Sequence, residues 1–168
     1  MTDKLPNIAF LAIGLMGAPM TRNLLNAGFP MTLWNRTSSK CEPFASEAVI
    51  AESPAEAVAS ADVVITMLEN SDVVEQVLVA QGAIDALKPG ALVIDMSSIQ
   101  PSVARRHGEL VAEQGAGYVD APVSGGTVGA AEARLSIMAG GSEADVDRAR
   151  PVFEALGKCT RIGPVGAG

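Results

Sequence analysis

A glycine-containing segment near the start of the chain is the first place where residue type and spacing could do chemistry. Residues 12–17 read Ala-Ile-Gly-Leu-Met-Gly, which keeps two glycines of the phosphate-binding pattern G-x-G-x-x-G and places Ala12 at the first. Gly14 would let the backbone approach a pyrophosphate, and Gly17 would let the following helix pack on the preceding strand. Ala12 fits this turn if its φ stays negative. A plain strand-to-helix turn is the alternative interpretation.

Polar residues follow the next apolar run, at Asn35, Arg36 and Thr37. About 20 residues after the glycines, an NAD site usually has Asp or Glu to hold the ribose 2′-hydroxyl. A carboxylate would repel a 2′-phosphate, whereas an amide, a guanidinium and a hydroxyl can all bind one. The pattern therefore favours NADP over NAD, with NAD still open. The alternative is a polar turn before a helix, with Arg36 solvated.

Few other residues in the sequence could take part in catalysis or metal binding. His107, the one histidine, falls in the middle of a predicted helix among charged neighbours, so we expect it to be solvated rather than catalytic. Asp95 and Asp120 follow apolar runs, and we expect both to order loops. Cys41 and Cys159 have no second ligand at metal-binding spacing. They are expected as small buried hydrophobic residues, and the sequence indicates no metal site.

The elements that must position these residues alternate along the chain. The predicted strands are residues 8–13, 31–34, 63–67, 91–94, 118–119, 135–138 and 159–162, and helical segments lie between them. Because apolar strands separated by helices are typical of a parallel sheet covered on both faces, the expected fold class is α/β, Rossmann-type and doubly wound. Ligands of such sheets bind at the carboxyl ends of the strands. The places to examine are residues 14–17, 35–37, 68–70, 95–99 and 120–126.

Composition excludes several classes of function. The 19 acidic residues outnumber the 12 basic ones and give a net charge of -7, which argues against a nucleic-acid partner. No apolar run approaches the ~20 residues of a membrane span, so no membrane segment is expected. Residues 1–7 lack the apolar core of a secretory signal, and the two cysteines lie far apart. These features favour a cytoplasmic protein.

Domain organisation follows from length and from the last residues. The length of 168 residues suits one domain, which we expect to span residues 1–162. Residues 163–168 read Gly-Pro-Val-Gly-Ala-Gly, and their composition predicts a loop or the start of a linker. A homodimer would cover any apolar surface left beside that segment.

Four segments together resemble the β-hydroxyacid dehydrogenases, which include 3-hydroxyisobutyrate dehydrogenase, tartronate semialdehyde reductase and glyoxylate/succinic semialdehyde reductases, and are 6-phosphogluconate dehydrogenase-like. Residues 14–20, Gly-Leu-Met-Gly-Ala-Pro-Met, resemble the opening loop of this family. Residues 34–41 resemble its NADP-preferring members, and residues 95–101 resemble its nicotinamide-side loop. Residues 120–141, beginning Asp-Ala-Pro-Val-Ser-Gly-Gly, resemble its substrate-binding signature.

The resemblance implies a role for individual residues. The implied cofactor-binding residues are Gly14, Leu15, Met16 and Gly17 at the pyrophosphate, Asn35, Arg36 and Thr37 at the adenosine ribose and its phosphate, Met67 and Leu68 beside the adenine, and Ser98 beside the nicotinamide. The implied substrate-binding residues are Ser124, Gly125 and Gly126. A hydroxyl followed by successive backbone N–H groups suits a small carboxylate-bearing substrate, because such groups bind anions without a cation.

The family's catalytic lysine follows the segment that is residues 163–168 here, on a helix that leads into an all-helical domain. This chain ends before that position, and we identify no catalytic residue within it. The expected function is the cofactor-binding domain of an NADP-dependent oxidoreductase, inactive alone. The alternative is a stand-alone dinucleotide-binding module or sensor. A methyltransferase is disfavoured, because it would need an acidic residue near Asn35.

Overall fold

The computed structural model describes residues 5–168. Residues 1–4 lie outside this range. They belong to residues 1–7, the segment that was compared above with a secretory signal. The strands are β1 (Ile8–Leu11), β2 (Met31–Trp34), β3 (Val49–Ile50), β4 (Val63–Thr66), β5 (Leu92–Asp95), β6 (Gly117–Asp120), β7 (Val123–Ser124), β8 (Leu135–Gly140) and β9 (Gly157–Gly163). The helices are α1 (Gly17–Asn26), α2 (Pro54–Val58), α3 (Ser71–Glu75), α4 (Pro101–Glu113), α5 (Gly126–Ala131) and α6 (Glu143–Glu154), with a 3₁₀ helix η1 (Ser38–Phe44) and a π-helical turn η2 (Gln76–Ala80).

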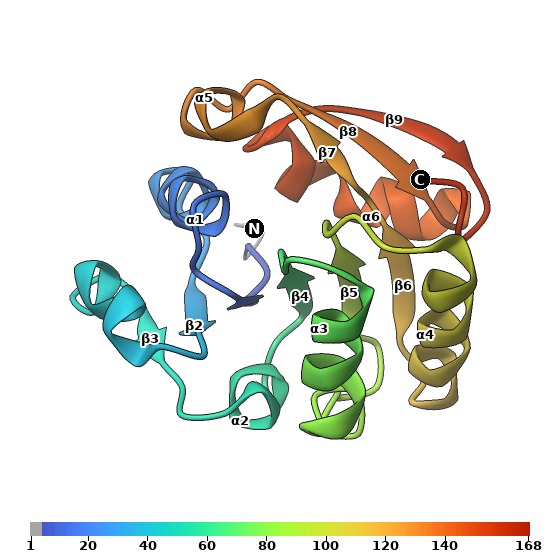
Figure 1. Ribbon diagram of the computed structural model, residues 1–168, viewed down its shortest axis with the longest axis horizontal. Coiled ribbons are helices and arrows are strands. Elements are labelled where there is room, and N and C mark those ends of the chain that lie inside the picture. Colours follow the sequence, from blue (N-terminus) through green and yellow to red (C-terminus); the bar gives the residue numbers. More distant parts are fainter. Residues whose placement is uncertain (1–4) are drawn as a thin grey trace, which may run out of the picture.

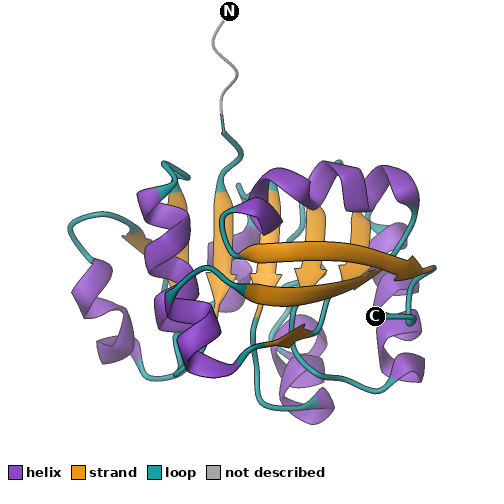
Figure 2. Ribbon diagram, turned by 90° about the horizontal axis from the view of Figure 1, so that it is seen from above, coloured by secondary structure: helices purple, strands orange, loops and turns teal. Residues whose placement is uncertain are grey.

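The strands form one mostly parallel sheet in the order β3-β2-β1-β4-β5-β6-β8-β7, and β9 pairs with β8. The first six positions are parallel, with β1 between β2 and β4. The pairs of β8 with β6 and β7 are antiparallel. In Figure 2, β8 and β9 cross the direction of the parallel strands. The expected Rossmann-type α/β class is confirmed.

Helices cover both faces of the sheet, as Figure 1 shows, with α2, α3 and α4 on one side and α1 and α6 on the other. Alternate residues of each strand enter two separate cores. Ile8 and Phe10 pack in the core under α1 and α6, whereas Ala9 and Leu11 pack in the core under α2, α3 and α4. Burial on both faces explains why these strands are apolar throughout rather than alternating.

Helix caps account for where several helices begin. The side chains of Ser53 and Ser142 accept hydrogen bonds from the N–H groups of Glu56 and Asp145, both at 3.1 Å, as N-caps of α2 and α6. The cap of α3 is Asn70, whose Oδ1 accepts a hydrogen bond from Val73 N–H at 3.0 Å. The short elements β3, β7 and α5 were not predicted, because they carry too few residues to show a period. The 3₁₀ helix η1 lies where the alternative interpretation of residues 35–37 placed a helix.

The expectation that His107 is solvated is wrong. Its side chain is fully buried, because Ala104, His107 and Val111 occupy the stripe of α4 that faces the sheet. The ring nitrogen Nε2 contacts the carboxylate of Glu75 on α3, which also pairs with Arg106. The side-chain hydrogen bond from Arg106, and after it the one with His107, hold the pKa of the Glu75 carboxyl below its usual value. His107 therefore joins α3 to α4 inside the fold.

Candidate functional site

The carboxyl ends of β1, β2 and β4 surround a cleft of about 400 Å³. The described residues that line it are Ala12, Gly14, Leu15, Met16, Gly17, Asn35, Arg36, Met67, Leu68, Glu69 and Val73. Eight of the ten cofactor-binding residues implied by the sequence are thus brought together, while Thr37 and Ser98 lie outside the lining. Ala12 and Val73 were not among the implied binding residues. Glu69 was not among them either, although it falls in residues 68–70, which the carboxyl-end rule had singled out.

The turn after β1 has a conformation that the sequence reading did not expect. Ala12 has φ +104°, so the negative φ that was the condition for alanine at this glycine position is not met. Ala12 N–H still donates to the Trp34 carbonyl oxygen at 2.8 Å, alongside the pairing of β1 with β2. β1 itself ends at Leu11, two residues earlier than predicted. A positive φ of this size is a glycine conformation. The departure from the glycine pattern at Ala12 therefore places a strained residue in the wall of the cleft.

The two remaining glycines serve different purposes. A Cβ atom added at Gly17 would lie 2.2 Å from the carbonyl oxygen of Ala12, so the protein's own packing requires this glycine. A Cβ atom added at Gly14 would meet nothing within 4 Å. Gly14 is exposed and its φ is not among the positive values. Neither packing nor backbone geometry requires a glycine there, and the bare backbone leaves room for an external group such as a pyrophosphate.

Asn35 shapes the same loop from the end of β2. Its Oδ1 accepts a hydrogen bond from Ile13 N–H at 2.9 Å, and its Nδ2 donates to the Thr37 carbonyl oxygen at 3.0 Å. The next residue, Arg36, is exposed and lines the cleft. Among the described residues that line the cleft, Arg36 carries the one positive charge and Glu69 the one negative charge.

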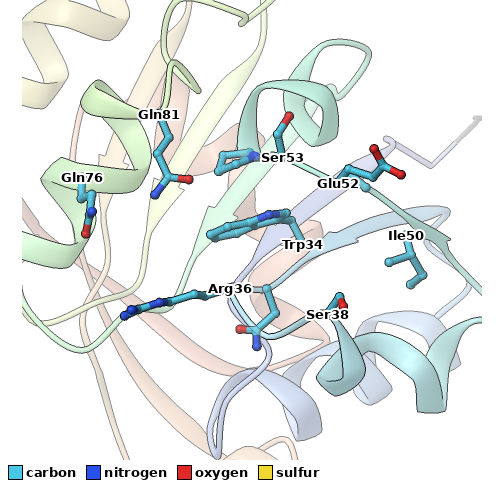
Figure 3. Close-up of a pocket in the computed structure, with 11 residues that line it drawn as sticks. Trp34, Arg36, Ser38, Ile50, Glu52, Ser53, Gln76 and Gln81 are labelled. Atoms are coloured by element: carbon cyan, nitrogen blue, oxygen red, sulfur yellow. The ribbon is translucent and has the colours of Figure 1, made fainter.

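A second, larger pocket of about 790 Å³ adjoins the cleft, and Asn35 and Arg36 line both. It lies between α2 and the end of α3, with Trp34 at its centre. In Figure 3 the Arg36 side chain extends along this pocket toward Gln76, while the carboxylate of Glu52 points away from Arg36. The guanidinium is therefore accessible from both spaces, in polar surroundings that suit an anion.

A buried carboxylate organises the ends of β4 and β5. Asp95 Oδ1 accepts hydrogen bonds from Thr66 Oγ1 at 2.9 Å and from Ser97 N–H at 3.0 Å. Ser97 Oγ in turn accepts from Leu68 N–H at 2.8 Å. Burial raises the pKa of Asp95, against the opposing effect of these hydrogen bonds. Asp95 thus orders the loop that precedes Ser98 and holds it against a wall of the cleft.

The segment implied as substrate-binding lies apart from the cleft lining. Ser124 ends β7, and Gly125 and Gly126 have φ +135° and +62° before α5 begins. All three residues are exposed. Successive glycines with positive φ can point neighbouring N–H groups toward one anion. Gly125 needs to be a glycine for its backbone, whatever it binds.

Some kinds of site find no support in residues 5–168. No group of three or more His, Cys, Asp or Glu side chains there is arranged to hold a metal ion. Across this described part of the chain, no helix has the length and apolar character needed to cross a bilayer. Cys41 is buried and Cys159 half-buried, and burial raises the pKa of both thiols.

These features define a dinucleotide-binding α/β domain. The strand order 3-2-1-4-5-6, a glycine loop at the first crossover and a cleft over the carboxyl ends are the marks of that class. The sequence pattern of the NAD binding domain of 6-phosphogluconate dehydrogenase matches residues 7–163. The chain belongs to this family and is an NAD(P)-binding domain of the β-hydroxyacid dehydrogenase type.

Individual relatives agree with this assignment. The chain is 43% identical over 164 residues to the NAD-dependent L-serine dehydrogenase of Pseudomonas aeruginosa, covering 96% of this chain and 55% of the relative. It is 39% identical over 163 residues to the 2-hydroxy-3-oxopropionate reductase of Escherichia coli, covering 96% and 56%. A solved Mycobacterium tuberculosis 3-hydroxyisobutyrate dehydrogenase with L-serine superposes with TM-score 0.92 at 42% identity, covering 98% and 56%. The chain thus spans about half the length of these relatives.

Proposed function

We propose that this chain is the cofactor-binding half of an NADP-dependent β-hydroxyacid dehydrogenase. The observation that carries the preference for NADP(H) is Arg36, exposed between two pockets at the end of β2, where many NAD sites place a carboxylate. Across residues 5–168 no ion pair engages its guanidinium. It is therefore free to bind a 2′-phosphate, and the hydroxyl of the next residue, Thr37, would contribute to the same contact.

The proposed reaction is hydride transfer between the nicotinamide and a small semialdehyde or 3-hydroxy acid, as in tartronate semialdehyde reductase. The bound cofactor supplies the hydride chemistry, and the protein supplies orientation and electrostatics. Ser98 would lie beside the nicotinamide, and the Ser124–Gly126 segment would bind the substrate carboxylate. The likeness to a 2-hydroxy-3-oxopropionate reductase supports this substrate class.

We further propose that the 168-residue chain binds cofactor without efficient turnover. Reduction of a carbonyl needs a positioned proton donor, whose loss costs typically ~10²- to 10⁴-fold in rate. The described residues that line the cleft include no lysine and no histidine. The same proposal includes a domain that spans residues 1–162, followed by the start of a linker at residues 163–168. It also includes a homodimer, which sedimentation of the purified chain tests.

The test of cofactor preference is calorimetric titration with NADPH and NADH. The unmodified chain should bind NADPH more tightly. Arg36→Asp should weaken NADPH by about 10- to 100-fold or more, because a charge-assisted bond of ~1.5–3 kcal/mol is lost and replaced by repulsion. NADH affinity should change little. The control is Lys158→Asp, which makes the same charge change on β9, far along the sheet from β2.

Two results would reject this assignment. The first is an equal loss of NADPH and NADH affinity in Arg36→Asp. The second is tighter binding of NADH by the unmodified chain, the outcome suggested by the relative named as NAD-dependent. Turnover is tested separately by following NADPH oxidation with glyoxylate. An enzyme-like rate from this chain would contradict the proposal that it binds without turnover.

A further inference from the structure

Asp120 stands at the carboxyl end of β6 and its carboxylate holds two backbone N–H groups of the last residues of the chain. Oδ1 accepts from Gly166 N–H at 2.7 Å, and Oδ2 accepts from Gly168 N–H at 3.0 Å. Asp120 is 3% exposed. The C-terminal end lies beside β6 and α4 in Figure 1. Both oxygens of one buried side chain therefore accept hydrogen bonds from residues that lie 46 and 48 positions away in sequence.

Three backbone segments meet at this residue. Asp120 pairs with Gly140 of β8, and residues 164–168 pass over both strands. A Cβ atom added at Gly140 would lie 2.7 Å from Asp120 Oδ1 and 2.8 Å from Gly168 N. A Cβ atom added at Gly168 would lie 2.5 Å from the carbonyl oxygens of Asp120 and Met138. Neither position has space for a side chain, so both glycines permit this close crossing.

Other contacts fix the start of the segment and its own turn. Gly141 N–H donates to the carbonyl oxygen of Gly163, the last residue of β9, at 2.9 Å, and within the segment Ala167 N–H donates to the Pro164 carbonyl oxygen at 3.0 Å. Gly166 has φ +94°, and a Cβ atom there would lie 3.1 Å from the Arg105 side chain of α4. Residues 164–168 are therefore packed between α4 and the end of β6, and are ordered by these contacts.

Burying the Asp120 carboxylate at this position is energetically unfavourable in itself. Burial raises the pKa of Asp120, while the N–H groups of Gly166 and Gly168 act in the opposite direction. The desolvation cost is offset by these hydrogen bonds, which are stronger than bonds between neutral groups because the acceptor is charged. Both side-chain hydrogen bonds of Asp120 in residues 5–168 go to segment 164–168. The hydrogen bonds that offset the desolvation of the Asp120 carboxylate are therefore the ones that hold segment 164–168.

We propose that Asp120 is a positioning residue that ties segment 164–168 to the substrate segment 120–126. The inference rests on the proposed function for its role in catalysis, because Asp120 is the first residue of the segment that carries Ser124, Gly125 and Gly126. By fixing both segments at one carboxylate, Asp120 sets the place from which the chain leaves β9 relative to the proposed substrate site. It contacts no reacting group.

The test compares Asp120→Asn with Asp147→Asn in the ¹⁵N-labelled chain. Asp147 is an exposed residue of α6 and provides the matched control. An asparagine offers one acceptor oxygen in place of two, so at least one of the Gly166 and Gly168 amide protons should move upfield and exchange about 10-fold faster or more. The signals of residues 124–126 should also shift. NADPH affinity should stay within about twofold, a factor worth under 0.5 kcal/mol.

A titration of the unmodified chain keeps the inference falsifiable if Asp120→Asn does not fold. The Asp120 carboxyl ¹³C signal and the two glycine amide signals should titrate together. Asp95 on β5 and Tyr118 on β6 are the neighbouring ionisable groups, and Arg105 on α4 lies against Gly166. The Asp95 signal is followed in the same spectra. The inference would be overturned if the Gly166 and Gly168 amide signals did not shift as Asp120 titrates. It would also be overturned if these signals and their exchange rates were unchanged in Asp120→Asn. Absence of NADPH binding by the unmodified chain would overturn the proposed function and leave this result standing.

Discussion

The side-chain oxygen of Asn35 accepts a hydrogen bond from the backbone N–H of Ile13 at 2.9 Å. This bond joins the end of β2 to the glycine turn after β1. The amide nitrogen of Asn35 is also engaged, with the Thr37 carbonyl oxygen. Asn35 therefore holds the glycine turn in shape and orients the backbone that carries Arg36, in addition to any contact it makes with a cofactor.

Replacing Asn35 with alanine should weaken NADPH and NADH equally, by about 10-fold, because removal of this bond leaves the Ile13 N–H without its partner at a cost of ~1–3 kcal/mol. Calorimetry with both nucleotides measures the effect. Asn23→Ala is the matched control, since Asn23 also donates one side-chain bond to a backbone carbonyl, that of Ala130 at 2.7 Å. It should lower stability without changing affinity. A selective loss of NADPH in Asn35→Ala would show instead that Asn35 binds the 2′-phosphate directly.

Asn35 also illustrates what the sequence could predict. Its position after an apolar strand, 21 residues beyond Gly14, placed it at the carboxyl edge of the sheet next to the glycine turn, and the structure agrees. Its hydrogen-bond partner could not be read from the chain. Ile13 offers a backbone N–H that any residue type would offer, and only the parallel pairing of β1 with β2 brings the two together.

Gly14 and Gly17 should respond differently to alanine. Gly17→Ala should destabilise the fold by several kcal/mol or prevent folding, because its Cβ would lie 2.2 Å from the Ala12 carbonyl oxygen. Gly14→Ala should keep its free energy of unfolding within ~1 kcal/mol and lose NADPH affinity, since its methyl group would occupy the space left for the pyrophosphate. Urea unfolding and calorimetry separate the two effects. Unchanged NADPH affinity in Gly14→Ala would argue that the cofactor does not approach this turn.

Ala12→Gly should stabilise the protein. The φ of +104° costs an alanine ~1–3 kcal/mol, and the greater backbone entropy of glycine in the unfolded chain takes back ~0.5–1 kcal/mol. A gain of about 1 kcal/mol in the free energy of unfolding is expected from the difference of these ranges. Ala133→Gly is the control, because Ala133 has φ +56° in the better-tolerated left-handed region and should gain less. Destabilisation by Ala12→Gly would mean that the methyl group contributes more through packing than the backbone loses through strain.

Ala12 and His107 show why the remaining features escaped the sequence. A negative φ was the condition under which Ala12 would fit the turn, and no local sequence signal shows that its φ is +104°. The charged neighbours of His107 suggested a solvated side chain. Its helical spacing from Ala104 and Val111 was the signal that could have placed it on the buried face. Its partner Glu75 comes from another helix, so no local pattern contained it.

The buried carboxyl group of Asp95 should make stability depend on pH in a defined direction. Burial raises its pKa above the usual value, so the folded state binds this proton more tightly than the unfolded state does. The free energy of unfolding from this group is therefore largest below about pH 4, the unfolded pKa of Asp, and falls as pH rises toward the raised pKa. Asp62 and Glu75, whose pKa values are lowered, contribute in the opposite direction and are present in every variant compared.

Asp95→Asn isolates this contribution, because an asparagine keeps an Oδ1 acceptor for Thr66 and Ser97 but carries no charge. Urea unfolding is measured between pH 4 and pH 7 for Asp95→Asn and for the unmodified chain. Because the variant lacks a contribution that falls with pH, its free energy of unfolding should change with pH by a more positive slope than that of the unmodified chain. The difference in slope should reach up to ~1.4 kcal/mol per pH unit where Asp95 titrates. Asp147→Asn, an exposed change, should leave the slope unaltered. Parallel curves for the unmodified chain and Asp95→Asn would mean that Asp95 titrates in the folded protein as it does in the unfolded one, and that water reaches its carboxylate.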